Sequence, residues 1–292
     1  MDEAAAADRN QRRAAWELAA HLALTFTLTW GISAVLVGFP DQVRTLVGAA
    51  TPLNRSWLFA LAVWSPTLSA VVVSLSFAGL ASLGALAAQA LRPASILWIA
   101  IAVFGFPAAI LAFGLGERVI APGGQHFIDL HALAVGAPTL LLASFTSLAI
   151  VNDGGLGEEP GWRGFALSRL LQFMGPLPAG LALGAVWGVW HLPAFLAQGG
   201  LAGSNFGLFL VSTVAMTVFM TWIYVHANGN FLIAGVIPHL VANFMGDAHV
   251  LTHDPDLVQA GVIVAVVAII LLIYGPSLQG RRARRASGKQ SG

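Results

Sequence analysis

The sequence predicts an all-α, polytopic membrane protein built as a bundle of about eight transmembrane helices. Two observations predict this class. Of the 292 residues, 57% are hydrophobic and only 9% are charged, with a mean hydropathy of +0.79. A soluble domain carries roughly 25% charged residues, so this chain could not cover its surface in water, and soluble-enzyme folds are excluded. In addition, six long stretches contain no Asp, Glu, Lys or Arg, and a spanning helix needs about 20 mostly apolar residues.

These uncharged stretches define the expected helices. The stretch 170–246 is long enough for three spans, and each of the other five supplies one. We expect helices near 16–39, 57–79, 94–115, 133–152, 178–198, 206–226, 230–249 and 256–275. The segment 80–92 is too short to span and is expected to lie at the membrane interface.

The chain is expected to divide into five regions. They are an N-terminal cytoplasmic segment, three spans with the interfacial helix, a core that holds the polar motifs, a last span and a basic disordered tail. Their boundaries are 1–15, 16–129, 130–250, 256–275 and 276–292.

The basic residues predict the orientation. An even number of spans places both termini on one side, and cytoplasmic loops carry an excess of Lys and Arg. With both termini in the cytoplasm, only Arg44, Arg55 and Arg118 lie outside. Eleven then lie inside, namely Arg9, Arg12, Arg13, Arg92, Arg163, Arg169, Arg281, Arg282, Arg284, Arg285 and Lys289. We therefore expect an integral protein with cytoplasmic termini, in the plasma membrane of a bacterium.

Two classes of partner and chemistry are excluded. The arginine cluster 281–285 directly follows a span, so it is interpreted as an anchor at anionic membrane lipid, and no nucleic-acid partner is expected. The absence of cysteine excludes disulfides, thiolate metal sites and a cysteine nucleophile.

Three polar clusters lie in or beside the expected spans, where ionisable groups are costly and by default mark a functional site. In chain order they are Glu158, Glu159 and Arg163 just cytoplasmic of the fourth span, His191 midway along the fifth, and His239 with Asn243 in the seventh.

The spacing of these residues indicates their local geometry. His239 and Asn243 are four residues apart and therefore share one helix face. Glu159 and Arg163 have the same spacing, in the order that favours a helical ion pair. Glu158 is rotated by about 100° from Glu159, so we expect a free carboxylate aimed into the bundle. Because proline is tolerated in a first helical turn but not in a helix interior, a helix is expected to restart at this motif, with Glu158 and Glu159 at its N-terminus.

One carboxylate, two imidazoles and one carboxamide at membrane depth form a hydrolytic set. A carboxylate and an imidazole can together deprotonate water, and His and Asn side chains can donate hydrogen bonds to a tetrahedral intermediate. Alternatively, Glu158, His191 and His239 could bind Zn²⁺, which would hold the attacking water. Asn is an uncommon zinc ligand, so Asn243 is assigned a donor role in both schemes.

The ordered pattern Glu-Glu-x-x-x-Arg, aromatic-x-x-x-His and His-x-x-x-Asn resembles the CAAX protease and bacteriocin-processing (CPBP) family of intramembrane endopeptidases, over about residues 130–250. The matching residues are Glu158, Glu159, Arg163, His191, His239 and Asn243. Trp187 stands where the second motif of the family often has Phe. The resemblance implies an eight-helix fold, an active site reached from the cytoplasm, and cleavage of membrane-associated peptides or proteins. It also implies two candidate mechanisms, metal-dependent or through Glu/His-activated water.

Other interpretations of the same residues remain open. The two acids could lie in a solvated loop, His191 could bond a backbone carbonyl freed near Pro193, and His239 with Asn243 could be interhelical hydrogen-bonding residues. A proton-coupled transporter could use the same Glu and His as a relay, and a non-catalytic chaperone or immunity protein could share the scaffold. The remaining histidines, His21, His126, His131, His226, His249 and His253, are interpreted as structural or solvated.

Overall fold

The protein is an all-α polytopic bundle. The computed structural model describes residues 2–48, 51–124, 126–132, 134, 154–196, 204–247 and 250–279. Its helices are α1 (Asp2–Gly38), α2 (Pro40–Val47), η1 (Leu53–Arg55), α3 (Trp57–Val63), α4 (Ser65–Ala78), α5 (Leu80–Ala90), α6 (Ile96–Ile120), α8 (Gly155–Glu159), η2 (Pro160–Leu167), α9 (Ser168–Leu170), α10 (Pro176–Trp190), α11 (Leu192–Leu196), α12 (Phe206–His226), η3 (Leu232–Val236), α13 (Ile237–Asp247) and α14 (Pro255–Tyr274). Within these residues no strand forms, and the backbone makes one isolated bridge, between Ile128 and Leu251.

The described residues contain five helices that are long and apolar enough to cross a membrane. They correspond to the expected spans 16–39, 94–115, 178–198, 206–226 and 256–275. The expected span 133–152 lies almost entirely outside the described residues, so the total of eight stays a prediction. The expected span 230–249 is instead a shorter apolar helix, Leu232–Met245.

The expected span 57–79 is broken into α3 and α4, which meet at an angle of 60°. The break lies where Pro66 cannot donate to the carbonyl of Ala62, and proline commonly kinks a helix in this way. The Thr29 hydroxyl donates to that carbonyl at 3.1 Å and also bonds the Ser65 hydroxyl. Side chains from α1 and α4 therefore satisfy the backbone that the bend frees, as an apolar environment requires.

The first polar motif lies on a continuous helical segment, α8–η2–α9, which begins at Gly155, so Glu158 and Glu159 lie near its N-terminus as expected. The segment is buried in the bundle, which excludes the alternative of a solvated loop. Pro160 is accommodated because the helix becomes π-helical from that residue and because Thr67 of α4 donates to the freed Leu156 carbonyl at 3.3 Å. The absence of a Cβ on Gly161 lets this segment lie directly on the backbone of Pro66.

Gly184 and Gly188 lie where α10 packs closely against α12. A Cβ atom on Gly184 would lie 2.6 Å from the Val214 Cα of α12, and one on Gly188 would lie 2.6 Å from the Thr213 hydroxyl. Small residues on α10 thus let α10 and α12 approach closely. This contact fixes the position of the end of α10 relative to α12.

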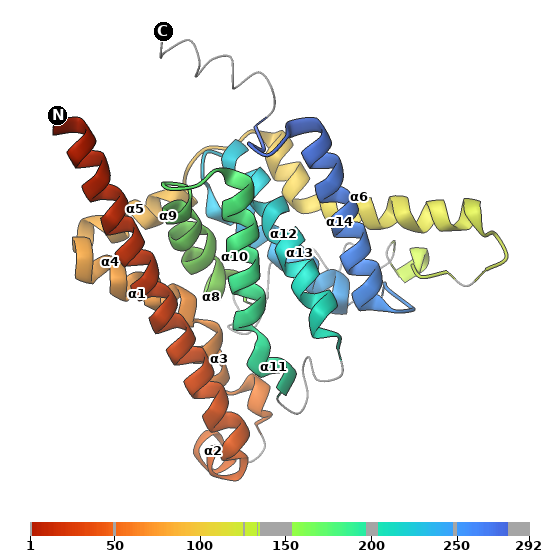
Figure 1. Cartoon of the computed structure of the whole chain (residues 1–292). Helices are drawn as coiled ribbons and strands as arrows, with labels where there is room; N and C mark the ends of the chain where they lie inside the picture. The colour runs from red at the N-terminus through yellow and green to blue at the C-terminus, as the bar shows by residue number, and fades with distance from the viewer. Residues whose placement is uncertain are drawn as a thin grey trace, which may run out of the picture.

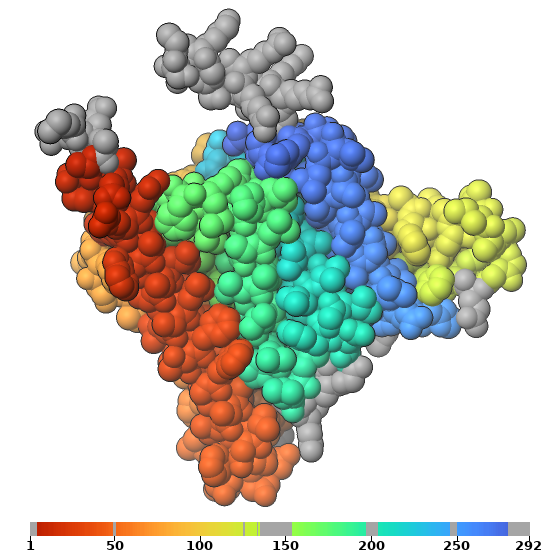
Figure 2. Space-filling view, in the orientation of Figure 1, coloured from red at the N-terminus to blue at the C-terminus, as the bar shows by residue number. Residues whose placement is uncertain are grey.

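The bundle has two distinct ends. At the terminus end, the start of α1, the end of α9, the start of α10 and the end of α14 lie together (Figure 1). Gln11 donates to the Gln172 carbonyl at 3.1 Å there, and Leu177 N–H donates to the Pro276 carbonyl at 3.3 Å. At the α2 end lie α2, α3 and α11, and Figure 2 shows α1 running along the outside from one end to the other.

Candidate active site

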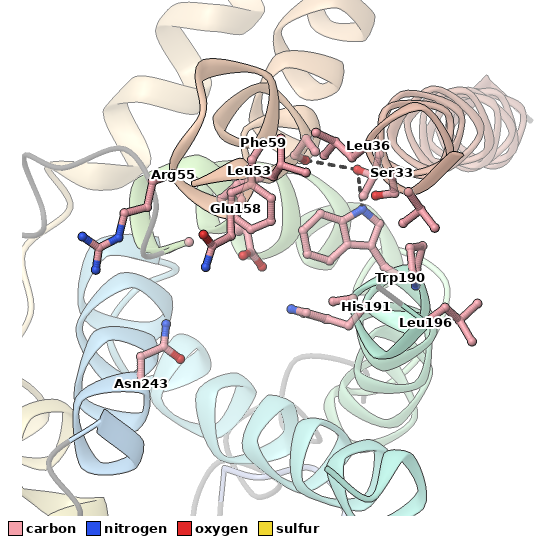
Figure 3. A pocket seen from close by; sticks show the side chains of 18 of the residues that line it. Ser33, Leu36, Leu53, Arg55, Phe59, Glu158, Trp190, His191, Leu196 and Asn243 are labelled. Carbon is pink, nitrogen blue, oxygen red and sulfur yellow. Dashed lines mark hydrogen bonds between the residues drawn. The ribbon is translucent and has the colours of Figure 1, made fainter. Parts of the chain in front are cut away.

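Four of the six predicted site residues line one cavity. Glu158 comes from α8, His191 from the residue after α10, and His239 and Asn243 from α13. The cavity has a volume of about 790 Å³. Figure 3 shows Glu158, His191 and Asn243 projecting into it from three different elements.

Glu159 and Arg163 form the predicted ion pair. Arg163 Nη1 donates to Glu159 Oε1 at 2.7 Å, and both side chains are fully buried. Arg163 also donates to the Thr217 hydroxyl of α12 at 2.9 Å. The hydrogen bond to Thr217 joins η2 to α12. Removing either partner of the buried ion pair would leave an uncompensated charge. Arg163 is therefore a buried structural cation, and its expected role as a cytoplasmic residue of the orientation bias is wrong.

Glu159 also orients His239, a contact that the sequence did not reveal. The His239 Nδ1 atom lies 2.7 Å from Glu159 Oε1, across 80 positions of sequence. A carboxylate can only accept, so Nδ1 carries the proton and Nε2 is the atom presented to the cavity. The hydrogen bond to Glu159, which is itself paired with Arg163, fixes the orientation of this imidazole.

Glu158, unlike Glu159, lines the cavity, as predicted for a carboxylate that points into the bundle. Its Oε2 accepts a hydrogen bond of 2.8 Å from the indole N–H of Trp187, and its side chain lines the cavity. Both acids are buried, so the interpretation of this motif as a solvated loop is excluded.

Gly154 marks the place where Glu158 and His239 converge. A Cβ on this residue would lie 2.5 Å from Glu158 Oε1 and 3.0 Å from His239 Nε2. Gly154 also has φ of +76°, a conformation that side chains of L-residues rarely adopt. One small volume beside Gly154 is thus within hydrogen-bonding reach of a carboxylate oxygen and an imidazole nitrogen.

His191 is held by a backbone carbonyl, as one of the alternative interpretations expected. Its Nδ1 lies 2.9 Å from the Trp187 carbonyl, which is free because the His191 N–H bonds Gly188 instead. A carbonyl only accepts, so Nδ1 is protonated and Nε2 of the neutral ring carries a lone pair. This bond is compatible with a functional role, since it orients the ring while His191 lines the cavity.

Trp187 contacts four residues of the site. Its N–H reaches Glu158, its carbonyl reaches His191, and its ring centroid lies 5.2 Å from that of His239 and 4.3 Å from Arg163 Cζ. The sequence singled it out only as an aromatic departure from Phe. The sequence feature that could have identified it is the indole N–H, a hydrogen-bond donor that phenylalanine lacks.

Asn243 completes the lining one helical turn after His239. It projects into the cavity from α13 and is exposed there (Figure 3). A carboxamide N–H₂ in this position can donate to a negatively charged oxygen.

The zinc alternative is not supported by the donor geometry. Among the described residues, no three His, Asp or Glu side chains lie close enough together to hold a metal ion. Glu158, His191 and His239 therefore do not fit a preformed zinc site, and the chemistry below is derived from the residues themselves.

The other histidines lie elsewhere. His21 is fully buried against Trp162 and Phe165, so it packs in the bundle as a structural residue. His226 stacks on Trp98 and bonds the Trp222 carbonyl at 2.9 Å. None of the described histidines other than His191 and His239 lines this cavity, and His249 lies outside the described residues.

Comparison with known proteins agrees with these motifs. Residues 138–245 match the model of the family described as type II CAAX prenyl endopeptidase Rce1-like. The chain is also 29% identical over 122 residues to CAAX prenyl protease 2 of Methanococcus maripaludis. This alignment covers 39% of this chain and 45% of that protein. The match thus spans less than half the length of this curated relative. Through the segment that contains all three motifs, the chain is similar to the CAAX protease (CPBP) family.

Proposed function

We propose that this protein is an intramembrane endopeptidase that hydrolyses peptide bonds of membrane-associated peptides or proteins with water activated by Glu158 and His191. The observation that carries the proposal is the convergence of Glu158, His191, His239 and Asn243 on one cavity. The family match supports peptidase chemistry, and processing of the CAAX or the bacteriocin type would suit a cavity inside a membrane bundle.

Glu158 is the general base. It takes a proton from a water molecule in the cavity, and the oxygen of that water forms a bond to the carbonyl carbon of the substrate. The electron pair of the C=O bond moves onto the carbonyl oxygen. The His191 Nε2 lone pair accepts the second hydrogen of the water as a hydrogen bond and aligns it.

His239 and Asn243 stabilise the negative oxygen of the tetrahedral intermediate. His239 can donate from Nε2 because Glu159 supports the imidazolium form through Nδ1, and Asn243 donates from its carboxamide. When the intermediate collapses, the C–N bond breaks and Glu158 returns its proton to the departing amine. Glu159 and Arg163 are positioning residues in this scheme.

The test is a cleavage assay with the purified protein in liposomes. Glu158→Gln removes the base with almost no change in shape, and loss of the base and its positioning should lower kcat by at least about 10²-fold. Glu117→Gln is the matched control, because Glu117 lies at the far end of α6, outside the cavity. Prenylated CAAX peptides and unmodified membrane peptides, tested side by side, would separate the two types of processing. Full activity of Glu158→Gln would overturn the assignment.

A further inference from the structure

Helix α1 has a polar side chain at every fourth position between Glu17 and Ser33. Glu17, His21, Thr25, Thr29 and Ser33 follow one another at this spacing, and the first four are buried. We call these five residues the polar row. Successive members lie about 6 Å apart along the helix axis, on neighbouring parts of its surface. Burying a polar group costs free energy unless the group is hydrogen-bonded, so each buried member needs a partner.

Both ends of the polar row have such partners. At the terminus end, Glu17 pairs with Arg13 at 2.8 Å and with Arg169 at 3.0 Å. In the last third of α1, the Thr29 hydroxyl accepts a hydrogen bond of 2.8 Å from the indole N–H of Trp190, at the end of α10. Thr29 and Trp190 both line the catalytic cavity. The polar row therefore leads from the terminus end to the site of the proposed chemistry.

The middle of the polar row differs, because its polar atoms lack protein partners. Among the described residues, neither ring nitrogen of His21 makes a hydrogen bond, and neither does the Thr25 hydroxyl. The Ser69 hydroxyl of α4 and the Trp162 indole N–H of η2 are unpartnered in the same way. All four side chains have 0% of their surface exposed. In native proteins, most buried polar side-chain atoms bond either protein or ordered water.

The antiparallel packing of α1 and α4 places Thr25 and Ser69 at one level. The Thr29 hydroxyl bonds the Ser65 hydroxyl at the start of α4, whereas Arg13, near the start of α1, bonds a carbonyl in the last turn of α4. Thr25 precedes Thr29 by four residues, and Ser69 follows Ser65 by four. Both are thus about 6 Å from the bonded pair in the same direction.

His21 lies one turn further along α1 and contacts the helix that carries the first motif. Its ring centroid lies 5.7 Å from that of Trp162 in η2. The unpartnered atoms of His21, Thr25, Ser69 and Trp162 therefore come from three helices that pack against one another, α1, α4 and η2. We call these four residues the inner polar cluster.

We propose that the inner polar cluster binds water and supplies it to the catalytic cavity. A buried water molecule typically makes about three hydrogen bonds to otherwise unpaired groups. The cluster offers the required mixture, since the Trp162 N–H donates, the hydroxyls of Thr25 and Ser69 donate and accept, and a neutral His21 ring does one of each. The next member of the polar row is Thr29, which lines the cavity, so a water molecule leaving the cluster along the row reaches the site.

The supply has a reason in the proposed reaction, because every cleavage consumes one water molecule. Asn54 and Arg55 are exposed residues of the cavity wall. A peptide that enters past them lies between Glu158 and the water outside, whereas the polar row reaches the cavity from within the bundle. The supply clause therefore rests on the proposed peptidase function, while water binding by the inner polar cluster stands on the packing alone.

Radiolytic footprinting of the full-length protein in detergent tests the binding of water. X-ray pulses produce hydroxyl radicals from water where it is held, so a buried ring is oxidised when a water molecule lies beside it. Phe165 and Phe106 are matched probes, with 0% and 2% exposed. The Phe165 ring centroid lies 4.9 Å from that of His21, whereas Phe106 packs in the apolar core. We expect oxidation of Phe165 and protection of Phe106, and equal oxidation of the two rings would overturn the proposal.

Thr25→Val tests the supply, because it removes the hydroxyl and keeps the shape of the side chain. We expect kcat to fall by about 3- to 10-fold, the range for loss of one hydrogen bond, with unchanged KM and a lower unfolding temperature. Thr221→Val is the matched control and should keep the parent kcat, because the buried Thr221 hydroxyl donates to the Thr217 carbonyl of its own helix at 2.7 Å.

A Thr25 hydroxyl that binds no water would give the opposite result. Replacing a buried, unpaired hydroxyl by a methyl group removes a desolvation cost, so the unfolding temperature would rise and kcat would stay the same. That outcome would overturn the proposal. Footprinting of the Glu158→Gln variant should match that of the parent, because water binding requires no catalysis. If the parent cleaves no peptide, the proposed function fails, and the oxidation of Phe165 still decides whether the inner polar cluster binds water.

Discussion

The indole N–H of Trp187 donates a 2.8 Å hydrogen bond to Glu158 Oε2. This bond occupies one carboxylate oxygen and leaves Oε1 beside Gly154 and His239. Since the Trp187 carbonyl also holds His191, one residue at the end of α10 sets the relative positions of the proposed base and its neighbouring imidazole. A phenylalanine in this position could supply the ring and the carbonyl but not the N–H.

Trp187→Phe should therefore impair catalysis more than folding. A hydrogen bond to a charged group contributes about 1.5–3 kcal/mol, so we expect kcat to fall by about 10- to 10²-fold while the ring packing against His239 and Arg163 is kept. Steady-state kinetics and thermal unfolding in the same detergent would measure both effects. Trp222→Phe is the control, because Trp222 Nε1 has no hydrogen-bond partner among the described residues. Equal kinetics for the two variants would show that the N–H has no role.

Glu159→Gln should lower both stability and activity. The substitution leaves Arg163 as a buried cation without its counter-charge, and breaking a buried pair in this way costs about 3–5 kcal/mol. It also replaces the carboxylate that supports protonated His239 with a neutral amide. We expect a lower unfolding temperature together with a loss of kcat that persists well below that temperature. Retention of full kcat in the folded fraction would contradict the positioning role of Glu159.

Gly154→Ala should reduce activity by displacing two site residues at once. The added Cβ would lie within 3.0 Å of Glu158 Oε1 and His239 Nε2, and alanine in this left-handed conformation costs about 1–2 kcal/mol. Because misplacement by about 1 Å can cost about 10²-fold in rate, we expect a fall in kcat of that order. Gly116→Ala is the matched control, since nothing lies within 4 Å of its Cβ position. If both variants keep the parent rate, Gly154 does not mark the reacting centre.

Chelation should leave the activity unchanged. The described residues present no cluster of three metal ligands. We therefore expect the same rate after dialysis against EDTA or 1,10-phenanthroline, with metal analysis of the dialysed protein as the control. Loss of activity that returns on adding Zn²⁺ would instead favour metal-bound water and a rearrangement of Glu158, His191 and His239 around the ion.

The sequence by itself determined the properties that depend on composition and on helical periodicity. Too few charges for a water-exposed surface required a lipid environment, and uncharged runs of span length required helices. The i, i+4 spacing placed Glu159 beside Arg163 and His239 one turn before Asn243, because neighbours on a helix face are fixed by local geometry alone.

Only the tertiary structure decided which groups meet across helices and where the site opens. Glu159 bonds His239 across 80 positions and Trp187 bonds Glu158 across 29, and periodicity within one helix contains no information about such pairs. Hydropathy placed the first motif outside the expected spans, because it scores Glu159 and Arg163 as two charges. In the fold they neutralise each other, so this polar segment is buried, and the packing of α1 and α10 places its cavity at the end of the bundle opposite the termini.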